Sequence, residues 1–187
     1  AGQNVVVTGG SRGIGRAIAE GFAARGANVL ICSRTQESVE TARKEMNDAG
    51  LKAEGIACDV GDEQQILTTV ETAISRLGHI DTLVNVAGVN RRKRAESVTS
   101  DDYDFILDTN LRGVWNVGQI AARRLVAAEK GGSIINVASV LGLGVQPGLA
   151  SYCASKGAVI QLTRAMAVDL TKHNIRVNAL APGWFKT

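Results

Sequence analysis

Tyr152 and Lys156 are the two side chains in this sequence best suited to acid–base chemistry. They are four residues apart, a spacing that places both on one face of a helix. A free tyrosine has a pKa of about 10, and a neighbouring ammonium group favours the ionised phenolate. A phenol tuned in this way can give a proton to a forming alkoxide or take one from an alcohol. The pair therefore predicts proton transfer at the oxygen of a carbonyl or a secondary alcohol.

Ser139 is a third polar side chain at a position suited to binding a ligand. It comes just after the apolar segment 134–137, which we expect to be a strand. In open α/β sheets, ligands bind at the carboxyl ends of the strands. We therefore expect the Ser139 hydroxyl to hydrogen-bond the substrate oxygen and to hold it against Tyr152. Ser151 and Ser155, which flank the tyrosine, are interpreted as local polar residues.

A glycine-rich segment near the N-terminus is typical of a phosphate-binding loop. The apolar strand Val5-Val6-Val7 is followed by Thr8-Gly9-Gly10-Ser11-Arg12-Gly13-Ile14-Gly15 and then by a segment with helical spacing. Glycines allow a tight turn, a close approach of the backbone to a pyrophosphate, and close packing of helix on strand. The first N–H groups of the helix then point at the anion. This order of strand, loop and helix favours nucleotide binding over an ordinary turn.

Two arginines indicate which dinucleotide binds. The second expected strand ends at Arg34 without an acid, whereas an NAD site usually has one there for the ribose 2′-hydroxyl. Arg34 would attract a 2′-phosphate, and Arg12 in the glycine loop is placed to reach the same group. Either arginine alone is equally explained as a surface residue. Together they predict NADP(H) as the cofactor.

The rest of the sequence alternates between strand-like and helical segments. Six short apolar runs predict buried strands: Val5-Val6-Val7, Val29-Leu30-Ile31, Gly55-Ile56-Ala57, Leu83-Val84, Ile134-Ile135-Asn136-Val137 and Arg176-Val177-Asn178-Ala179-Leu180. Helical stripes lie between them: Ile14, Ile18 and Phe22; Val39, Ala42 and Met46; Ile66, Val70, Ala73 and Leu77. This pattern predicts an α/β fold, a Rossmann-type doubly wound parallel sheet of six strands in the order 3-2-1-4-5-6, with helices on both faces.

Two longer helices are expected in the second half of the chain. One begins near Thr99, which forms a potential capping box with Asp102, and runs through Leu125; the other runs from about Ser151 to Lys172. Helix ends are expected at Gly26, Gly50, Gly78 and Gly131. The sequence has no internal repeat beyond the strand–helix unit and no linker. We therefore expect residues 1–187 to form a single NADP-binding domain.

These motifs resemble the short-chain dehydrogenase/reductase family, whose hallmark T-G-x-x-x-G-x-G matches residues 8–15. The resemblance implies a Ser-Tyr-Lys triad made of Ser139, Tyr152 and Lys156. It also implies hydride transfer between a nicotinamide and a carbonyl or secondary alcohol. Asn110 corresponds to the family's asparagine that anchors a water-linked proton relay to the lysine. Without the resemblance, Asn110 would be read as a solvated mid-helix asparagine.

The resemblance further implies which residues hold the cofactor. Asp59 would bind the adenine amino group and Val60 would offer its N–H to the ring, although Asp59 is also explained as a cap for the helix near Asp62. The family's N-N-A-G motif appears with Val86 in place of its second asparagine, which puts one side-chain hydrogen bond in doubt. The implied set is Thr8, Gly9, Ser11, Arg12, Gly13, Ile14, Gly15, Arg34, Asp59, Val60, Asn85, Ala87, Gly88, Tyr152, Lys156, Pro182, Gly183, Phe185 and Thr187.

The basic run Arg91-Arg92-Lys93-Arg94 leaves several interpretations open. It is explained by a solvated loop, or by binding of an anionic substrate, since it follows the fourth strand near the expected site. By resemblance, members of the gluconate 5-dehydrogenase type have an arginine pair there, and 3-oxoacyl-carrier-protein reductases use basic surfaces to recruit an acidic carrier. The expected substrate is therefore a small carbonyl or alcohol compound, a sugar acid or a 3-oxoacyl thioester. A carrier protein docking on the basic run is a further hypothesis.

Composition argues against several other classes of protein. The net charge of +3 is too mild for nucleic-acid binding, and no apolar stretch is long enough to cross a membrane. The first residues show no export signal, and Cys32, Cys58 and Cys153 are scattered, with no C-x-x-C pair. These features predict a cytoplasmic protein without a bound metal. By analogy with the family, we expect a homo-oligomer, a dimer or tetramer that pairs the two long helices.

Two hypotheses for the whole chain follow. The first is an NADP(H)-dependent enzyme that uses the triad, and the second is a catalytically silent NADP-binding regulator or scaffold of the same fold. Family members usually continue past the position of Thr187 with a substrate lid and a seventh strand. We therefore expect the chain to be a fragment that lacks the lid and that strand.

Overall fold

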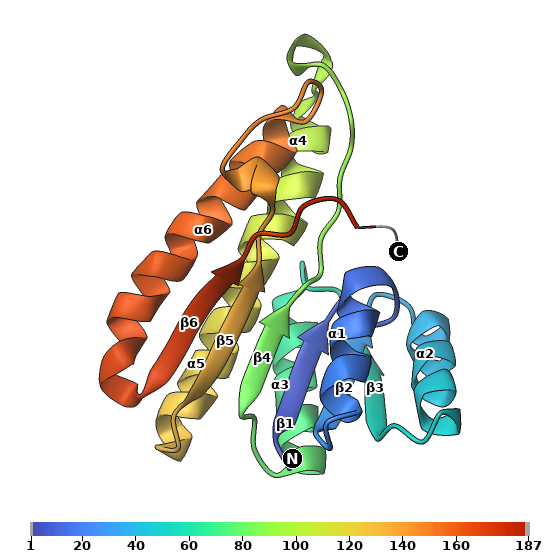
Figure 1. The fold of residues 1–187 in the computed structure, drawn as a ribbon. Helices are drawn as coiled ribbons and strands as arrows, with labels where there is room; N and C mark the ends of the chain where they lie inside the picture. The colour runs from blue at the N-terminus through green and yellow to red at the C-terminus, as the bar shows by residue number, and fades with distance from the viewer. Residues whose placement is uncertain (1, 186–187) are drawn as a thin grey trace.

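One parallel sheet of six strands organises the chain (Figure 1). The structure is a computed structural model that describes residues 2–185, so Thr187 lies outside the described residues. The strands are β1 (Asn4–Thr8), β2 (Asn28–Ser33), β3 (Ala53–Ala57), β4 (Thr82–Asn85), β5 (Gly132–Val137) and β6 (Ile175–Leu180). Their order is β3-β2-β1-β4-β5-β6, and every neighbouring pair is parallel. This confirms the predicted topology, in which the order reverses between β1 and β4.

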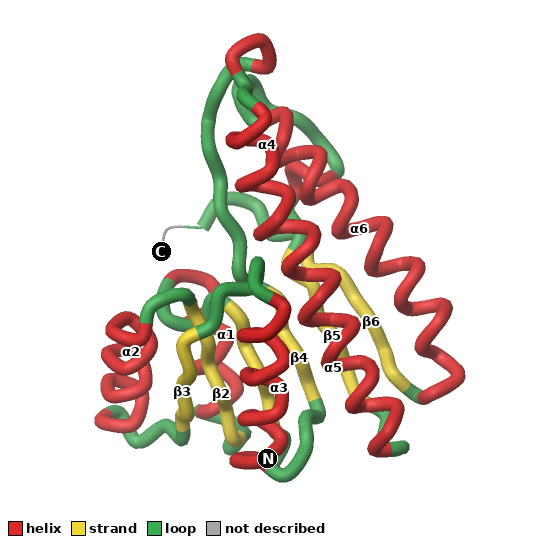
Figure 2. Tube along the Cα trace, turned by 180° about the vertical axis from the view of Figure 1, so that it is seen from behind, coloured by secondary structure: helices red, strands yellow, loops and turns green. Residues whose placement is uncertain are grey.

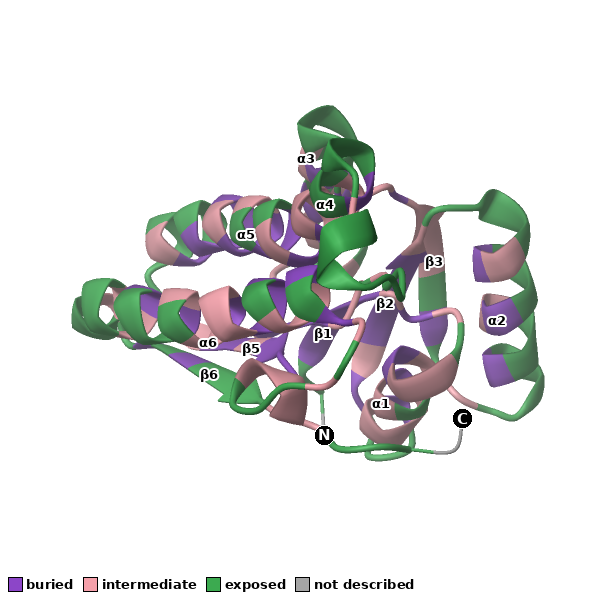
Figure 3. Cartoon of the chain, turned by 90° about the horizontal axis from the view of Figure 1, so that it is seen from above, coloured by how far each residue is buried: buried purple, intermediate pink, exposed green. Residues whose placement is uncertain are grey.

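Helices cover both faces of this sheet, as predicted (Figure 3). On one face lie α1 (Gly13–Ala23) and α2 (Gln36–Asp48). On the other lie α3 (Glu63–Leu77), α5 (Val114–Ala128) and α6 (Ala150–Leu170), which Figure 2 shows in front of the strands. Among residues 2–185, no helix combines the length and the apolar character that a membrane crossing needs.

Alternate side chains of each central strand enter two separate apolar cores. Val6 and Leu30 pack beneath α3, α5 and α6, whereas Val5, Val7 and Ile31 pack beneath α1 and α2. All five are at most 1 % exposed. Because both faces are covered, these strands have no polar side, which explains their continuous apolar sequences.

Helix α1 packs on the sheet through smaller side chains than the predicted stripe. Gly15, Ala19 and Ala23 are buried, while Ile18 and Phe22 are half-buried at the margin of the contact. Small residues at the centre let the helix lie close to β1 and β2. That closeness fixes the position of the helix N-terminus above the end of β1.

The two edge strands differ from the prediction of continuous burial. In β6, Ile175 and Val177 are buried but Arg176, Asn178 and Leu180 are exposed, because this strand pairs within residues 2–185 with β5 alone. The prediction of a fully buried last strand was therefore wrong.

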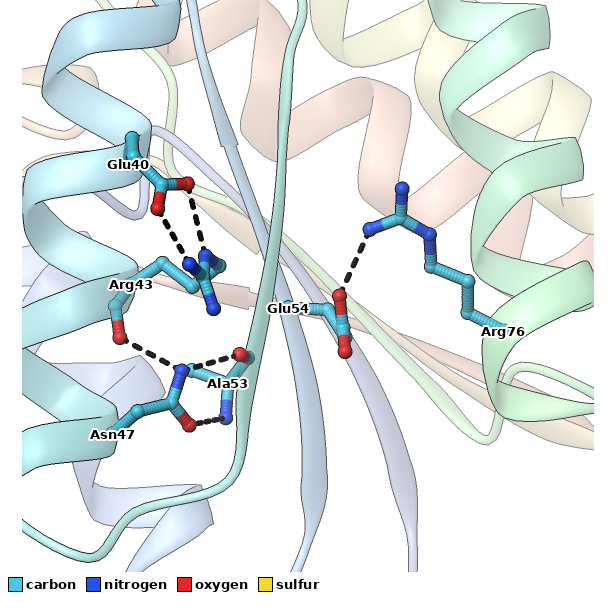
Figure 4. Close-up of polar contacts among 6 residues, drawn as sticks. All are labelled: Glu40, Arg43, Asn47, Ala53, Glu54 and Arg76. Atoms are coloured by element: carbon cyan, nitrogen blue, oxygen red, sulfur yellow. Dashed lines mark hydrogen bonds and ion pairs between the residues drawn. The ribbon is translucent and has the colours of Figure 1, made fainter.

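At the opposite edge, polar side chains close off β3 (Figure 4). Asn47 on α2 donates to the Ala53 carbonyl (2.9 Å) and accepts from the Ala53 N–H (3.2 Å). On the other side of the strand, Glu54 pairs with Arg76 of α3 at 2.8 Å. Satisfied backbone groups and charged side chains make such an edge a poor template for further strand pairing.

The first of the two long helices is interrupted, contrary to the prediction of a continuous helix. It begins as α4 (Ser100–Leu107), widens into a π-helical turn η2 (Asp108–Gly113) and continues as α5. The capping box of Thr99 and Asp102 is confirmed. A π-helical turn inserts extra backbone into a helix and is often found at functional sites. Here it contains Asn110.

The remaining helix boundaries follow the predicted signals. Helix α6 ends at Leu170 and passes through the short helix η4 (Thr171–His173) into β6. Two further short helices are η1 (Ala95–Ser97) and η3 (Val140–Gly142). The four glycines predicted at helix ends lie one to three residues beyond the last helical residue, and all have positive φ angles between 69° and 86°. At α5 the left-handed residue next to the helix is Glu129, with a φ of 54°, and not Gly131.

Candidate functional site

A cavity of about 520 Å³ lies along the carboxyl ends of the strands. Its walls come from the glycine loop, the end of β2 and the loops that follow β3, β4, β5 and β6. The predicted residues that line it are Gly9, Ser11, Arg12, Gly13, Ile14, Gly15, Arg34, Val60, Ala87, Gly88, Ser139, Tyr152, Gly183 and Phe185. Residues from both halves of the sequence thus meet in one space, at the point where the strand order reverses.

The glycine loop is shaped by positions that admit no side chain. A Cβ atom on Gly15 would lie 2.2 Å from the Gly9 carbonyl oxygen, and one on Gly9 would lie 2.9 Å from the Ala87 nitrogen. Gly9 and Gly13 also have positive φ angles of 67° and 56°. The loop therefore exposes bare backbone to the cavity at the start of α1, an arrangement that suits a phosphate group.

Thr8 lies behind this loop rather than in the cavity wall. It is 2 % exposed, and its hydroxyl oxygen accepts hydrogen bonds from the N–H groups of Val86 (3.1 Å) and Ala87 (3.2 Å). It thereby joins the end of β1 to the loop after β4. The structure places Thr8 as a support for the cavity and not as one of its lining residues.

Two cations stand at the end of the cavity near β2. Arg12 is the extended residue before α1, Arg34 follows β2 directly, and both are exposed and line the cavity. Ser33 also lines it, and the hydroxyl of Thr35 caps α2 by accepting from the Ser38 N–H at 3.4 Å. Two guanidinium groups beside a helix N-terminus form a positive end suited to a phosphate.

Asp59 and Val60 occupy different positions relative to the cavity. Val60 lines it and packs against Gly113, where a Cβ would come within 2.8 Å of Val60. The Asp59 carboxylate accepts from the Gly61 N–H at 2.9 Å and is not among the lining residues. The alternative that Asp59 caps the next helix is wrong, because Asp62 provides that cap by accepting from the Gln65 N–H.

Asn85 is buried beneath the cavity and not in its wall. Its amide donates to Asn136 Oδ1 (2.9 Å), and Asn136 in turn donates to the Thr163 hydroxyl (3.0 Å), so β4, β5 and α6 are joined by polar side chains. The side-chain oxygen of Asn85 is buried without a hydrogen-bond partner among residues 2–185. Val86, the residue that departs from the family motif, lines the cavity.

Tyr152 and Lys156 face one common cavity beside the first. This smaller space of about 260 Å³ is lined by both residues and by Ser139, Pro182 and Gly183. Lys156 Nζ lies 5.8 Å from the centre of the Tyr152 ring and donates to the Val137 carbonyl at 2.8 Å. Burial of the side chain lowers the pKa of Lys156 to about 8, because removal from water penalises the charged form.

Ser139 lies just after the carboxyl end of β5, and the backbone of Leu141 fixes its hydroxyl there. Its hydroxyl oxygen accepts from the Leu141 N–H at 3.1 Å, which caps the short helix η3. A hydroxyl that accepts one hydrogen bond keeps a proton that it can donate. Ser139 lines both cavities and shares both with Tyr152.

Asn110 is buried and fully engaged, which contradicts its reading as a solvated residue. Its side-chain oxygen accepts from the Val89 N–H (2.7 Å), and its amide donates to the Val89 carbonyl (2.9 Å) and to the Ser155 hydroxyl (3.2 Å). The interpretation of Ser155 as a local polar residue was incomplete. No spacing signal connects these two residues in the sequence, because the π-helical turn sets where Asn110 points.

The basic run is divided between two structural roles. Arg91 and Lys93 both bind the buried carboxylate of Asp102, and the Arg91 guanidinium lies 3.9 Å from the centre of the Phe105 ring. Hydrogen bonds from Lys93 and from Thr99 hold the pKa of Asp102 well below its usual value. Arg91 and Lys93 are exposed, as the solvated-loop interpretation predicted, but they also anchor the loop to α4 through Asp102.

Arg92, another member of the basic run, contacts a loop that borders the large cavity. Arg92 donates to the Pro147 carbonyl at 3.4 Å and so contacts the loop that connects η3 with α6. That loop contributes Gln146 and Leu149 to the large cavity, and Asn90 lines it from the β4 side. The sequence analysis did not identify Asn90 or Gln146. Their position in the loops after β4 and β5 could have indicated that they line the cavity, because those loops follow the carboxyl ends of the strands.

Comparison with known proteins places the chain in a family. A family model described as short chain dehydrogenase matches residues 3–187. The chain belongs to the short-chain dehydrogenase family. Its fold agrees with that assignment, because two solved structures of this kind, from Sinorhizobium meliloti and Mycobacterium marinum, cover 100% and 98% of the chain with a TM-score of 0.95 each.

Similar short-chain dehydrogenases include two curated enzymes. A gluconate 5-dehydrogenase of Gluconobacter oxydans is 40% identical over 186 residues, which are 100% of this chain and 72% of that protein. A 3-oxoacyl-[acyl-carrier-protein] reductase of Thermotoga maritima is 37% identical, with 100% and 75% covered. These relatives are oxidoreductases.

A solved structure is similarly close to this short-chain dehydrogenase. The crystal structure of a gluconate 5-dehydrogenase from Burkholderia cenocepacia in complex with NADP and tartrate is 38% identical. It has a TM-score of 0.94 and covers 100% of this chain and 72% of that one. That protein thus carries its NADP on a fold that matches the whole of this chain.

Proposed function

We propose that this short-chain dehydrogenase is an NADP(H)-dependent oxidoreductase that interconverts a carbonyl and a secondary alcohol. One domain, residues 1–187, would hold the cofactor and carry the Ser-Tyr-Lys triad. The observation that carries the proposal is the convergence of Ser139, Tyr152 and Lys156 on one cavity that adjoins the glycine loop. A protein that merely bound the nucleotide would have no need of a buried lysine beside a tyrosine at that place.

The residues around the large cavity fit a dinucleotide phosphate. Gly9 and Gly15 leave backbone free at the start of α1, where added Cβ atoms would collide with neighbouring backbone. Arg12 and Arg34 provide positive charge at the far end, where a 2′-phosphate would lie. Bound there, NADPH supplies the hydride for the carbonyl carbon.

Three side chains would act on the oxygen side of the reaction. The Ser139 hydroxyl donates a hydrogen bond to the substrate oxygen and orients it. The Tyr152 hydroxyl gives its proton to the oxygen as the alkoxide forms, and takes it back in the reverse direction. The Lys156 ammonium stabilises the negative charge that this transfer leaves on the tyrosine oxygen. Asn110 holds the Val89 segment of the wall in place through two hydrogen bonds.

The choice of NADP(H) over NAD(H) rests on the two arginines. Arg34→Glu should lower kcat/KM for NADPH by about 10- to 100-fold, since it removes charge-assisted hydrogen bonds to a phosphate and adds repulsion. The same change should leave kcat/KM for NADH equal or higher. Arg16→Ala is the matched control: this arginine lies on α1 but pairs with Glu20 and Glu45. Equal losses with both cofactors would contradict the assignment.

The proposed substrate is a small anionic hydroxy or oxo acid of the sugar-acid type. Two amide side chains, Asn90 and Gln146, line the large cavity and suit a ligand with several hydroxyl groups. Arg92 lies beside the loop that carries Gln146 and adds positive charge at that end. The similarity to gluconate 5-dehydrogenases supports this class, and the similarity to the carrier-protein reductase makes 3-oxoacyl thioesters the second class to assay.

Steady-state assays with both classes test the proposal. The protein is incubated with NADPH and a panel of oxo acids, ketoses and 3-oxoacyl thioesters, and with NADP⁺ and the matching alcohols. We expect turnover with at least one anionic sugar-type compound, and a rise in its KM in Arg92→Glu. Tight NADPH binding without turnover across the panel would instead support the silent regulator.

A further inference from the structure

The Ser155 hydroxyl occupies a position between the two groups that frame the catalytic lysine. It is 1 % exposed, donates to the Tyr152 carbonyl at 2.7 Å, and accepts from the Asn110 side-chain amide at 3.2 Å. A serine hydroxyl has one proton to give. Because that proton is used on Tyr152, Ser155 can meet Asn110 solely as an acceptor.

This constraint fixes which end of the Asn110 amide faces which neighbour. The NH₂ group must point at Ser155, and its second proton goes to the Val89 carbonyl at 2.9 Å. The side-chain oxygen then faces the Val89 N–H at 2.7 Å. The Asn110 amide thus has one orientation that satisfies both of its neighbours, Ser155 on α6 and Val89 after β4.

The oxygen that is selected in this way borders the space next to Lys156. A Cβ atom on Gly88 would lie 3.3 Å from the Asn110 side-chain oxygen and 3.6 Å from Lys156 Nζ, so both atoms flank the same small volume. An acceptor there is compatible with a buried ammonium, whereas an inverted amide would present a donor to it.

We propose that Ser155 is a positioning residue that keeps the Asn110 oxygen, and not its NH₂ group, towards the catalytic ammonium of Lys156. The inference rests on the proposed function, since it assigns a role within that reaction. Ser155 touches neither cofactor nor substrate in this scheme. Its effect on the reaction passes through Asn110 and through the turn of α6 that carries Tyr152 and Lys156.

Comparing Ser155→Thr with Ser155→Val separates the effect of the hydroxyl group from the effect of a larger side chain. Threonine keeps a hydroxyl that can bond a carbonyl three or four residues back in a helix, and valine has the same shape without it. Ser155→Ala tests the loss of the hydroxyl without added bulk. Ser151→Ala, at a buried serine one turn earlier on α6, is the control for serine replacement in this helix.

The readouts are kcat, KM, NADPH binding by fluorescence, and the dependence of kcat on pH. Ser155→Val should have a kcat about 10-fold below that of Ser155→Thr, as expected for one buried hydrogen bond, with NADPH affinity and KM within about twofold. Ser155→Ala should resemble Ser155→Val, and Ser151→Ala should resemble the wild type. Among the side chains that line the small cavity, Tyr152 and Lys156 are the titratable ones. In Ser155→Val and Ser155→Ala the Lys156 ammonium should be less well stabilised, so that it loses its proton at lower pH. The fall of kcat on the alkaline side should therefore begin at lower pH in these two variants.

Several outcomes would overturn the inference. Equal kcat values and pH profiles in Ser155→Thr, Ser155→Val and Ser155→Ala would show that the hydroxyl does not matter to the reaction. A lower melting temperature with an unchanged pH profile would show a structural role alone. If the wild type turns over substrate, either of these two outcomes would leave the proposed function intact. If the wild type shows no turnover, both the proposed function and the role of Ser155 would be contradicted.

Discussion

Lys156 is a buried, positively charged residue. This combination allows it to stabilise negative charge on a neighbouring atom. The side chain is 4 % exposed, and its ammonium donates a hydrogen bond to the Val137 carbonyl at 2.8 Å. Within residues 2–185 no carboxylate forms an ion pair with it. The charge is therefore costly to the fold and available to stabilise negative charge on a neighbouring oxygen.

Burying the charge of Lys156 destabilises the folded protein, and this effect predicts how the free energy of unfolding depends on pH. The pKa of Lys156 is about 8 in the folded protein and 10.5 as its ordinary value, so between these values the unfolded state binds more protons. Stability is therefore lost as pH falls from 10.5 towards 8, and it is regained as pH rises over the same interval. Relative to Lys156→Met, the wild type should gain about 2 kcal/mol of unfolding free energy between pH 7 and pH 9.5.

Urea denaturation of both proteins at the two pH values measures this difference. The comparison with Lys156→Met cancels the titration of all other groups that the two proteins share. A difference that stays constant with pH would contradict a depressed pKa at this lysine.

Sequence reasoning located some of the side chains of the site and missed how others are used. The residue types and spacing of Tyr152 and Lys156 placed them correctly on one face of α6, beside one cavity. The contact of Asn110 with Ser155 was out of reach, because it depends on a π-helical turn that no local pattern indicates. Likewise, the run Arg91 to Arg94 contained no sign that Asp102 would bind two of its four cations.

The start of α1 depends on how closely this helix approaches the glycine loop. A Cβ on Gly15 would come within 2.2 Å of the Gly9 carbonyl oxygen, which is backbone and cannot move aside cheaply. The helix would have to shift away from β1, and its first N–H groups would leave the phosphate position.

Gly15→Ala should therefore lose at least about 10-fold in NADPH affinity and should unfold at a lower temperature. Gly21→Ala is the matched control in the same helix, because its Cβ would meet the Arg25 guanidinium at an ordinary 3.8 Å. Alanine has the higher helix propensity, so Gly21→Ala should leave binding unchanged and stabilise by up to about 1 kcal/mol. Isothermal titration and thermal melts report both quantities; unchanged NADPH affinity in Gly15→Ala would refute the close-approach argument.

The strands that are buried on both faces were the easiest to predict from the sequence. Central strands β1, β2 and β4 were recognisable because both faces are covered and their sequences are continuously apolar. Strand β6 was assigned correctly in position but not in burial, since an apolar run does not reveal that a strand lies at an edge. Glycines at helix ends were the most direct signals, because a positive φ angle limits the choice of residue.

The large cavity joins segments of the molecule that are far apart in the sequence. Its walls include the glycine loop, the loops after β2, β3, β4 and β5, and Gly183 to Phe185 after β6. A ligand in this cavity would contact both halves of the sheet. Binding to the folded state alone stabilises a protein by mass action.

Saturating NADPH should therefore raise the melting temperature of the whole protein. At 100 times the dissociation constant the gain is about 2.7 kcal/mol, which corresponds to roughly 5–10 °C for a chain of this size. NADH at the same concentration should give a smaller shift, and Arg34→Glu should abolish the difference between the two. Equal shifts with NADPH and NADH in the wild type would contradict recognition of the 2′-phosphate.

If Tyr152 transfers the proton in a hydride-transfer reaction, Tyr152→Phe should stop that transfer. The substitution removes one oxygen atom from a side chain that lines both cavities. Single-turnover measurements with NADPH and the best substrate of the panel should show a rate at least about 100-fold below the wild type, as expected for loss of an acid catalyst. NADPH affinity should change by less than about twofold. An undiminished rate in Tyr152→Phe would show that Tyr152 is not the proton donor.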